Sequence, residues 1–201
     1  MSPRAQMTRQ RGFTMLEILV SLLLIVVGLL GMLGLQAQAT VAEFESYQRG
    51  QALILAQDMA DRINANRKSV LCYVVTDATS GSPQLGSGAA AAVCASPSTG
   101  TAVTRAMATQ DLADWSQSLL GAAETTTSGT KVGAMLGARG CVSYDAVTGL
   151  YRVAVAWQGM SPTISPATVD ARANCGLNQF GTDSNRREVA MSFRIANLVA
   201  P

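Results

Sequence analysis

The feature that most constrains this chain is an apolar run of 23 residues, from Phe13 to Leu35, with a single charge, Glu17. At about 1.5 Å of rise per residue, a helix of that length spans roughly 35 Å, enough to cross a bilayer core of about 30 Å. Three arginines and no acidic residue precede the run, so the positive-inside rule keeps residues 1–12 in the cytoplasm and exports the remainder. The sequence therefore predicts one membrane span followed by an exported part.

Glu17 is the unusual residue of this span. An unpaired charge so close to the bilayer interior costs several kcal/mol, and an ionisable residue there is functional by default. A secretory signal has a shorter apolar core, about 7–15 residues, and then a small-residue cleavage site that this run lacks in convincing form. A plain signal anchor explains the length and orientation but gives no reason for Glu17. A position at the membrane interface, with the carboxylate reaching water, is the remaining alternative.

Residues 11–17, Arg-Gly-Phe-Thr-Met-Leu-Glu, resemble the class III signal of type IV pilins and of the pseudopilins of type II secretion systems. The resemblance implies that a membrane aspartyl peptidase, the prepilin peptidase, cuts after Gly12 and methylates the new amino terminus, Phe13. It gives Glu17 the part of the family glutamate, which helps to recruit a subunit into a growing filament. It also implies a pilin fold of the α+β class, with a long N-terminal helix packed on a small antiparallel sheet of about three or four strands.

The membrane helix is expected to continue to about Asn66. No proline occurs between Pro3 and Pro83, and residues 36–66 are rich in residues that favour helix. Such a helix is roughly 80 Å long. The expected domains are a leader (1–12), a transmembrane half of the helix (13–35), an amphipathic half (36–66) and a periplasmic globular head (67–201).

The amphipathic half carries an apolar stripe at helical spacing. Asp58 and Arg62 lie off that stripe and are correctly ordered for an ion pair one turn apart. The stripe consists of Ala52, Leu55, Met59 and Ile63.

Composition excludes several classes of function. The formal charge of +2 comes from 15 basic and 13 acidic residues, and removing the leader leaves 12 against 13, or −1, which offers no basic field for nucleic acid. Histidine is absent, which excludes Ser-His-Asp and Cys-His catalysis and the histidine-containing zinc motifs. We identify no phosphate loop, acid–base pair or metal cluster, and so expect no catalytic residue, no cofactor and no metal.

The four cysteines all follow the span and so lie on the exported side. None belongs to a Cys-x-x-Cys pair, and an even number in an oxidising space indicates two disulfides with three possible connectivities. We favour the local pairing, Cys72 with Cys94 and Cys141 with Cys175.

The middle of the chain is less regular. A short strand-like run at 70–75 precedes a stretch rich in Ser, Gly, Ala and Thr, which we expect to be a surface loop pinned by Cys72 and Cys94. A short helix is predicted over residues 109–121, with Thr109 as its N-cap. A polar connection over residues 122–131 should follow.

That short helix should bury one face. Leu112, Trp115 and Leu119 share it, so Trp115 is expected to anchor the core rather than to bind a ligand.

The last third of the chain is predicted to be a sheet. Residues 141–144 and 151–158 should pair as an antiparallel hairpin through a connection at 145–149, and residues 189–196 alternate as a third strand. The helix stripe should cover one face of this sheet.

The loop before the third strand contains two motifs that we expect to be solvated. Residues 183–185, Asp-Ser-Asn, lack the glycine and the closing glutamate of a calcium-binding EF-hand. Arg186 and Arg187 could clamp an anion or a partner carboxylate, but before an edge strand they are expected to be a solvated gatekeeper.

Features of the last third also resemble those of minor pilins. They are the run at 151–159, the pair Cys175–Gly176, and Arg186 with Arg187. The resemblance implies a minor pilin of the type IV pilus that primes assembly or forms part of the tip complex, supporting twitching motility and adhesion. The implied partners are the prepilin peptidase, the other minor pilins, the major pilin and a large tip adhesin, with no nucleic acid.

The resemblance also implies a location. The chain would reside in the bacterial inner membrane as a single-pass protein with its head in the periplasm, and later in the pilus fibre at the cell surface. The alternative is a minor pseudopilin of a type II secretion system, which the leader alone cannot distinguish. A membrane-anchored exported enzyme is a third hypothesis, and the absence of histidine argues against it.

Overall fold

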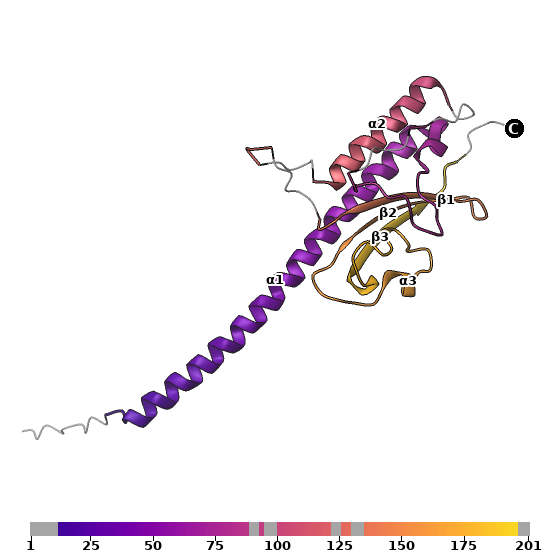
Figure 1. The fold of residues 1–201 in the computed structure, drawn as a ribbon. Coiled ribbons are helices and arrows are strands. Elements are labelled where there is room, and N and C mark those ends of the chain that lie inside the picture. Colours follow the sequence, from indigo (N-terminus) through magenta and orange to yellow (C-terminus); the bar gives the residue numbers. More distant parts are fainter. Residues whose placement is uncertain (1–11, 89–92, 95–99, 122–125, 130–134, 197–201) are drawn as a thin grey trace, which may run out of the picture. The chain divides into compact units, whose positions relative to one another are not determined.

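The computed structural model forms two compact units, residues 1–43 and 44–201, and each is described by itself. Gly12 is the one residue of the expected leader that the structure describes. The described residues are 12–88, 93–94, 100–121, 126–129 and 135–196 (Figure 1).

The two long helices come first in the chain and the three strands come after them, so the fold belongs to the α+β class. In chain order they are α1 (Met15–Ala65), the 3₁₀ helix η1 (Arg67–Tyr73), α2 (Ala102–Leu119), β1 (Arg139–Asp145), β2 (Leu150–Gln158), α3 (Pro166–Val169), the 3₁₀ turn η2 (Asp183–Asn185) and β3 (Arg186–Phe193).

Helix α1 contributes to the core of the second unit through the predicted stripe. Ala52, Met59 and Ile63 are fully buried, and Leu55 is partly buried against the same cluster. Asp58 and Arg62 form the predicted ion pair, with the Arg62 Nε 3.0 Å from the Asp58 carboxylate. The helix ends at Ala65, one residue before the predicted end.

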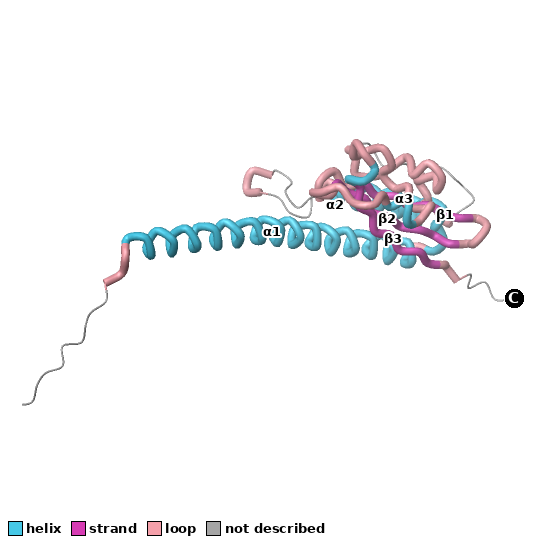
Figure 2. The backbone as a smooth tube through the Cα atoms, turned by 90° about the horizontal axis from the view of Figure 1, so that it is seen from below, coloured by secondary structure: helices cyan, strands magenta, loops and turns pink. Residues whose placement is uncertain are grey.

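The three strands form one antiparallel sheet in the order β1-β2-β3, and they lie side by side in Figure 2. The register pairs Val142 of β1 with Val153 of β2, and Val153 with Met191 of β3. Every second residue of β2 therefore faces the stripe of α1, as the alternation predicts.

The opposite face of the sheet is also covered. Ala154 and Ala156 of β2 are buried there with Phe180, which comes from the long β2–β3 connection. Burial on both faces explains why β2 carries small apolar residues between its large ones.

Two predicted elements of the middle region are wrong in type or extent. The strand-like run at 70–75 is largely the 3₁₀ helix η1, which buries Ser69, Cys72 and Tyr73. Only its end resembles a strand, because the backbone N–H groups of Val75 and Thr76 donate to the carbonyl of Val142. The residues of the expected surface loop at 89–92 and 95–99 lie outside the described part of the chain.

Helix α2 begins seven residues earlier than predicted. Thr101, not Thr109, is its N-cap, and Thr101 and Thr104 form a reciprocal capping box. Thr109 lies inside the helix, where its hydroxyl donates to the Arg105 carbonyl. The predicted face is correct, because Leu112, Trp115 and Leu119 are buried.

The third strand is displaced relative to its prediction. It runs from Arg186 to Phe193 instead of over 189–196, because the pairing with β2 already begins at Arg186, opposite Gln158.

Trp115 holds α2 to α1 by a hydrogen bond as well as by packing, since its Nε1 donates to the Leu55 carbonyl at 2.8 Å. Trp115→Phe should lower the free energy of unfolding by about 0.5–1.5 kcal/mol more than Trp157→Phe does. Trp157 is a matched control because it is equally buried and its Nε1 has no partner among the described residues. Urea unfolding of the full chain in detergent, followed by circular dichroism, measures the difference; equal losses would contradict it.

Candidate functional site

The start of α1 is capped by Thr14. The Thr14 Oγ1 accepts from the backbone N–H of Glu17 at 3.3 Å, and the Thr14 carbonyl accepts from Glu17 and Ile18. This is the geometry of an N-cap residue, and Thr-x-x-Glu is the sequence of a capping box. Gly12 and Phe13 precede the helix in non-helical backbone. The expected cleavage position therefore lies just outside a defined helix start.

Sequence reasoning missed the role of Thr14, although the spacing to Glu17 could have revealed it. The Glu17 carboxylate lies in the first turn of α1, where the helix dipole favours a negative charge. Within the described residues this carboxylate has no hydrogen-bond or ion-pair partner. Glu17 is thus available to a group from another molecule.

The part of α1 that lies in the first unit is apolar and exposed. Residues 12–40 are all exposed, including large side chains such as Phe13, Leu16 and Ile18. By length and composition α1 could cross a membrane, with a mean hydropathy of 2.9 in its most apolar window and none of that window buried. An apolar surface of this extent requires lipid or other protein to cover it.

Both disulfides are present in the local pairing. Cys72 is bonded to Cys94, and Cys141 is bonded to Cys175. The first ties η1 to the stretch before α2. The second ties β1 to the β2–β3 connection, and both of its cysteines are buried.

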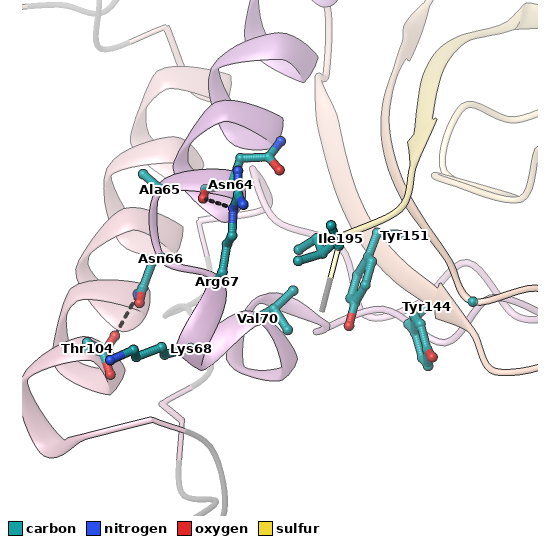
Figure 3. Close-up of a pocket in the computed structure, with 12 residues that line it drawn as sticks. Asn64, Ala65, Asn66, Arg67, Lys68, Val70, Thr104, Tyr144, Tyr151 and Ile195 are labelled. Atoms are coloured by element: carbon teal, nitrogen blue, oxygen red, sulfur yellow. Dashed lines mark hydrogen bonds between the residues drawn. The ribbon is translucent and has the colours of Figure 1, made fainter. Parts of the chain in front are cut away.

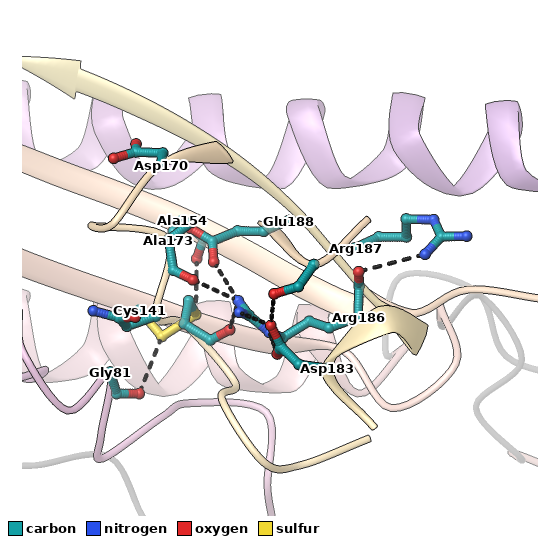
Figure 4. A network of polar contacts seen from close by, with 12 residues as sticks. Gly81, Cys141, Ala154, Asp170, Ala173, Asp183, Arg186, Arg187 and Glu188 are labelled. Atoms are coloured by element: carbon teal, nitrogen blue, oxygen red, sulfur yellow. Dashed lines mark hydrogen bonds and ion pairs between the residues drawn. A yellow bond between two sulfur atoms is a disulfide. The ribbon is translucent and has the colours of Figure 1, made fainter. Parts of the chain in front are cut away.

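Arg186 is not a solvated gatekeeper, which corrects the expectation for this residue. Its side chain is 0% exposed, and Figure 4 shows it at the centre of a polar network. The guanidinium donates to the Asp183 carboxylate from Nε at 2.6 Å and to Glu188 from Nη1 at 2.8 Å. It also donates to the backbone carbonyls of Ala173 and Cys175. Together these acceptors provide hydrogen-bond and ion-pair partners for one buried guanidinium.

Asp183 takes part in the same network, although none of residues 183–185 is buried. The Arg186 hydrogen bond lowers the pKa of Asp183 below its ordinary value. Burial raises the pKa of Glu188, against the opposing effect of Arg152 and Arg186. Glu188 was missed from the sequence, although residues two apart on a strand share a face.

Arg187 also forms an ion pair within the protein. Its Nη2 lies 3.2 Å from the Glu45 carboxylate of α1, and the same Glu45 oxygen accepts from the backbone N–H of Met160. Arg187 therefore connects α1, β3 and the β2–β3 connection in the second unit. Across the described residues, no group of three or more Cys, Asp or Glu side chains could hold a metal ion.

Two family models match this chain in adjoining stretches. The model of the prokaryotic N-terminal methylation motif matches residues 7–33, which include Gly12, Phe13 and Glu17. A model described as Tt1218-like, type IV pilin Tt1218, matches residues 34–115, from within α1 to Trp115 of α2. No curated protein and no solved structure matches the chain. The sheet lies outside both matched stretches.

Proposed function

We propose that this chain is a type IV pilin, and more narrowly a minor pilin, which enters the fibre in few copies and primes its assembly or forms part of its tip. Type IV pilins are structural proteins rather than enzymes. A methylation motif and an apolar N-terminal helix fit a subunit that is anchored in a membrane before it joins other pilins. Twitching motility and adhesion are the cell functions that such a subunit would support.

One observation carries this proposal: the carboxylate of Glu17, which has no partner among the residues that the structure describes, stands in the first turn of an exposed apolar helix. Peptidase cleavage after Gly12 would create a positive amino terminus at Phe13, and methylation leaves that charge in place. In the fibre, Glu17 of one subunit neutralises the amino terminus of the adjoining subunit. Two unit charges about 4 Å apart attract by about 4 kcal/mol at an effective dielectric constant of 20.

The proposed division of the chain follows from this assembly. Residues 1–12 are the leader, 13–35 the span, 36–66 the amphipathic helix and 67–201 the head. The three arginines of the leader favour a cytoplasmic amino terminus and a head in the periplasm. The two disulfides of the head support an oxidising compartment.

The finer assignment is to proteins like the type IV pilus modification protein PilV. It is supported by the run at 151–159, by Cys175–Gly176 and by the two arginines before β3. Deleting the gene tests the system: loss of surface pili and twitching supports the pilus. Loss of enzyme secretion with normal pili would assign the chain to a type II secretion system instead.

Replacing Glu17 tests the assembly role directly. We expect Glu17→Gln to be cleaved normally but to fall at least about tenfold in sheared pili, because a loss of several kcal/mol exceeds the 1.4 kcal/mol that corresponds to tenfold. Glutamine has nearly the size and shape of glutamate and removes only the charge. Immunoblots of membranes and of sheared pili measure both quantities.

Glu43→Gln is the matched control, because Glu43 is an exposed glutamate on the same helix. It should be incorporated as the natural chain is. Normal amounts of the Glu17→Gln chain in pili would show that incorporation does not need the charge of Glu17.

A further inference from the structure

A pocket of about 980 Å³ lies beside the C-terminal end of α1, within the second unit. Residues 64–68 form its helix side, and Tyr144 and Tyr151 form its sheet side, with Val70 and Ile195 between them (Figure 3). Its size is at the upper end of the range for ligand sites, roughly 300–1,000 Å³.

The charged residues that line this pocket are all basic. Arg67 and Lys68 are both exposed, and no residue that lines the pocket is acidic. The Arg67 Nε donates to the Asn64 carbonyl at 3.0 Å, as a basic residue does at a helix end. Its terminal nitrogens and the Lys68 ammonium have no partner among the described residues. Four other pockets that the structure describes each include an Asp or a Glu.

The remainder of the lining is aromatic and aliphatic. The ring centroids of Tyr144 and Tyr151 are 4.6 Å apart, and Val70 and Ile195 pack against the core. Leu71, which follows the lining residue Val70 in the sequence, is a large apolar side chain that stays 50% exposed. Apolar side chains around a pocket are what a protein partner buries. A small polar ligand would leave them in water.

We propose that this pocket docks a segment of a neighbouring pilin subunit in which an acidic residue stands beside an apolar one. The carboxylate pairs with Arg67 and Lys68, and the apolar side chain fills the space between Val70, Ile195 and Tyr151. The inference rests on the proposed function, because assembly supplies the neighbouring subunits. Charge complementarity of this kind selects a partner more than it adds affinity.

Crosslinking within assembled pili tests the proposal on the full chain. A benzophenone amino acid replaces Leu71, the cells are irradiated, and crosslinked peptides from sheared pili are identified by mass spectrometry. We expect a crosslink to a segment of another pilin that contains Asp or Glu. With Arg67→Glu and Lys68→Glu together, the yield per incorporated chain should fall at least about tenfold, because juxtaposed like charges are strongly unfavourable.

The matched control exchanges the two cations, Arg67→Lys with Lys68→Arg, and should keep the crosslink. The deciding measurement is rescue: reversing the charge of the crosslinked acidic residue in the partner should restore the yield of the double glutamate variant. If the double glutamate variant is absent from pili, the same charge reversal in the partner should restore both its incorporation and its crosslink.

The outcomes separate the inference from the proposed function. If the Leu71 variant and the natural chain are both absent from pili, the proposed function fails. If the chain is present in pili, any of four results overturns the inference: no crosslink, a crosslink within the same chain, a yield that is insensitive to charge, or no rescue.

Discussion

A chain with valine in place of Gly12 is expected to keep its leader and to accumulate as the full-length precursor. The peptidase has to place the backbone beside the cut in its own active site, and a β-branched side chain there obstructs the approach that glycine permits. A Cβ at Gly12 would meet nothing within 4 Å in this chain, so the substitution leaves the subunit itself undisturbed. The effect therefore belongs to recognition by the peptidase.

Intact-mass measurement of the membrane protein distinguishes the precursor from a product that begins at Phe13. Gly34→Val is the matched control, because Gly34 also has open space around its Cβ position and lies far along α1 from the cut. The control should be processed normally. A mature amino terminus at Phe13 in the Gly12→Val chain would remove the leader assignment.

Replacing Arg186 by methionine should destabilise the head by about 3–5 kcal/mol, the usual cost of removing one partner from a buried ionic network. Asp183 would lose its ion pair, Glu188 would lose one of two arginines, and two backbone carbonyls would lose a donor. Methionine has a comparable length, so the volume of the site changes little. Urea unfolding followed by tryptophan fluorescence reports on the head, because Trp115 and Trp157 are both buried in its core.

Two further variants show whether charge is the cause. Arg172→Met removes an arginine whose side chain is 61% exposed, and its ion pair with Asp170 should be worth less than about 1 kcal/mol. Arg186→Met combined with Asp183→Asn should recover part of the stability, since the second change removes the carboxylate that the first leaves without an ion pair. A single Arg186→Met chain as stable as the Arg172→Met chain would contradict the proposed role of the network.

The features that the sequence reveals are those that repeat along the chain. The stripe of α1 and the alternation in β2 follow from periods of 3.6 and 2, and each period places its residues on one face without knowledge of the remaining fold. The apolar span and Glu17 stand out for the same reason, because a long uninterrupted run makes a single charge visible. Helix α2 was also predicted, but its predicted start was too late, because the N-cap is Thr101, with Thr104 as its partner, and not Thr109.

The features that could not be predicted depend on partners far apart in the chain. Arg187 bonds Glu45 across 142 positions, and Arg186 is buried because Asp183, Glu188 and two loop carbonyls converge on it. An arginine pair before a strand is usually exposed, and only the folded connection changes that environment. The pocket beside α1 is likewise assembled from four separate stretches of chain.

The burial of Cys141 and Cys175 imposes an order on maturation. Each is 3% exposed, Cys141 in β1 and Cys175 in the loop that leads from β2 to β3. An oxidising enzyme cannot reach these sulfurs once that loop has closed, so their oxidation has to come before or during the closure. A newly exported subunit that meets no oxidant before the loop closes would bury Cys141 and Cys175 as two free thiols. Oxidant supplied later could then form the disulfide only after the loop reopened.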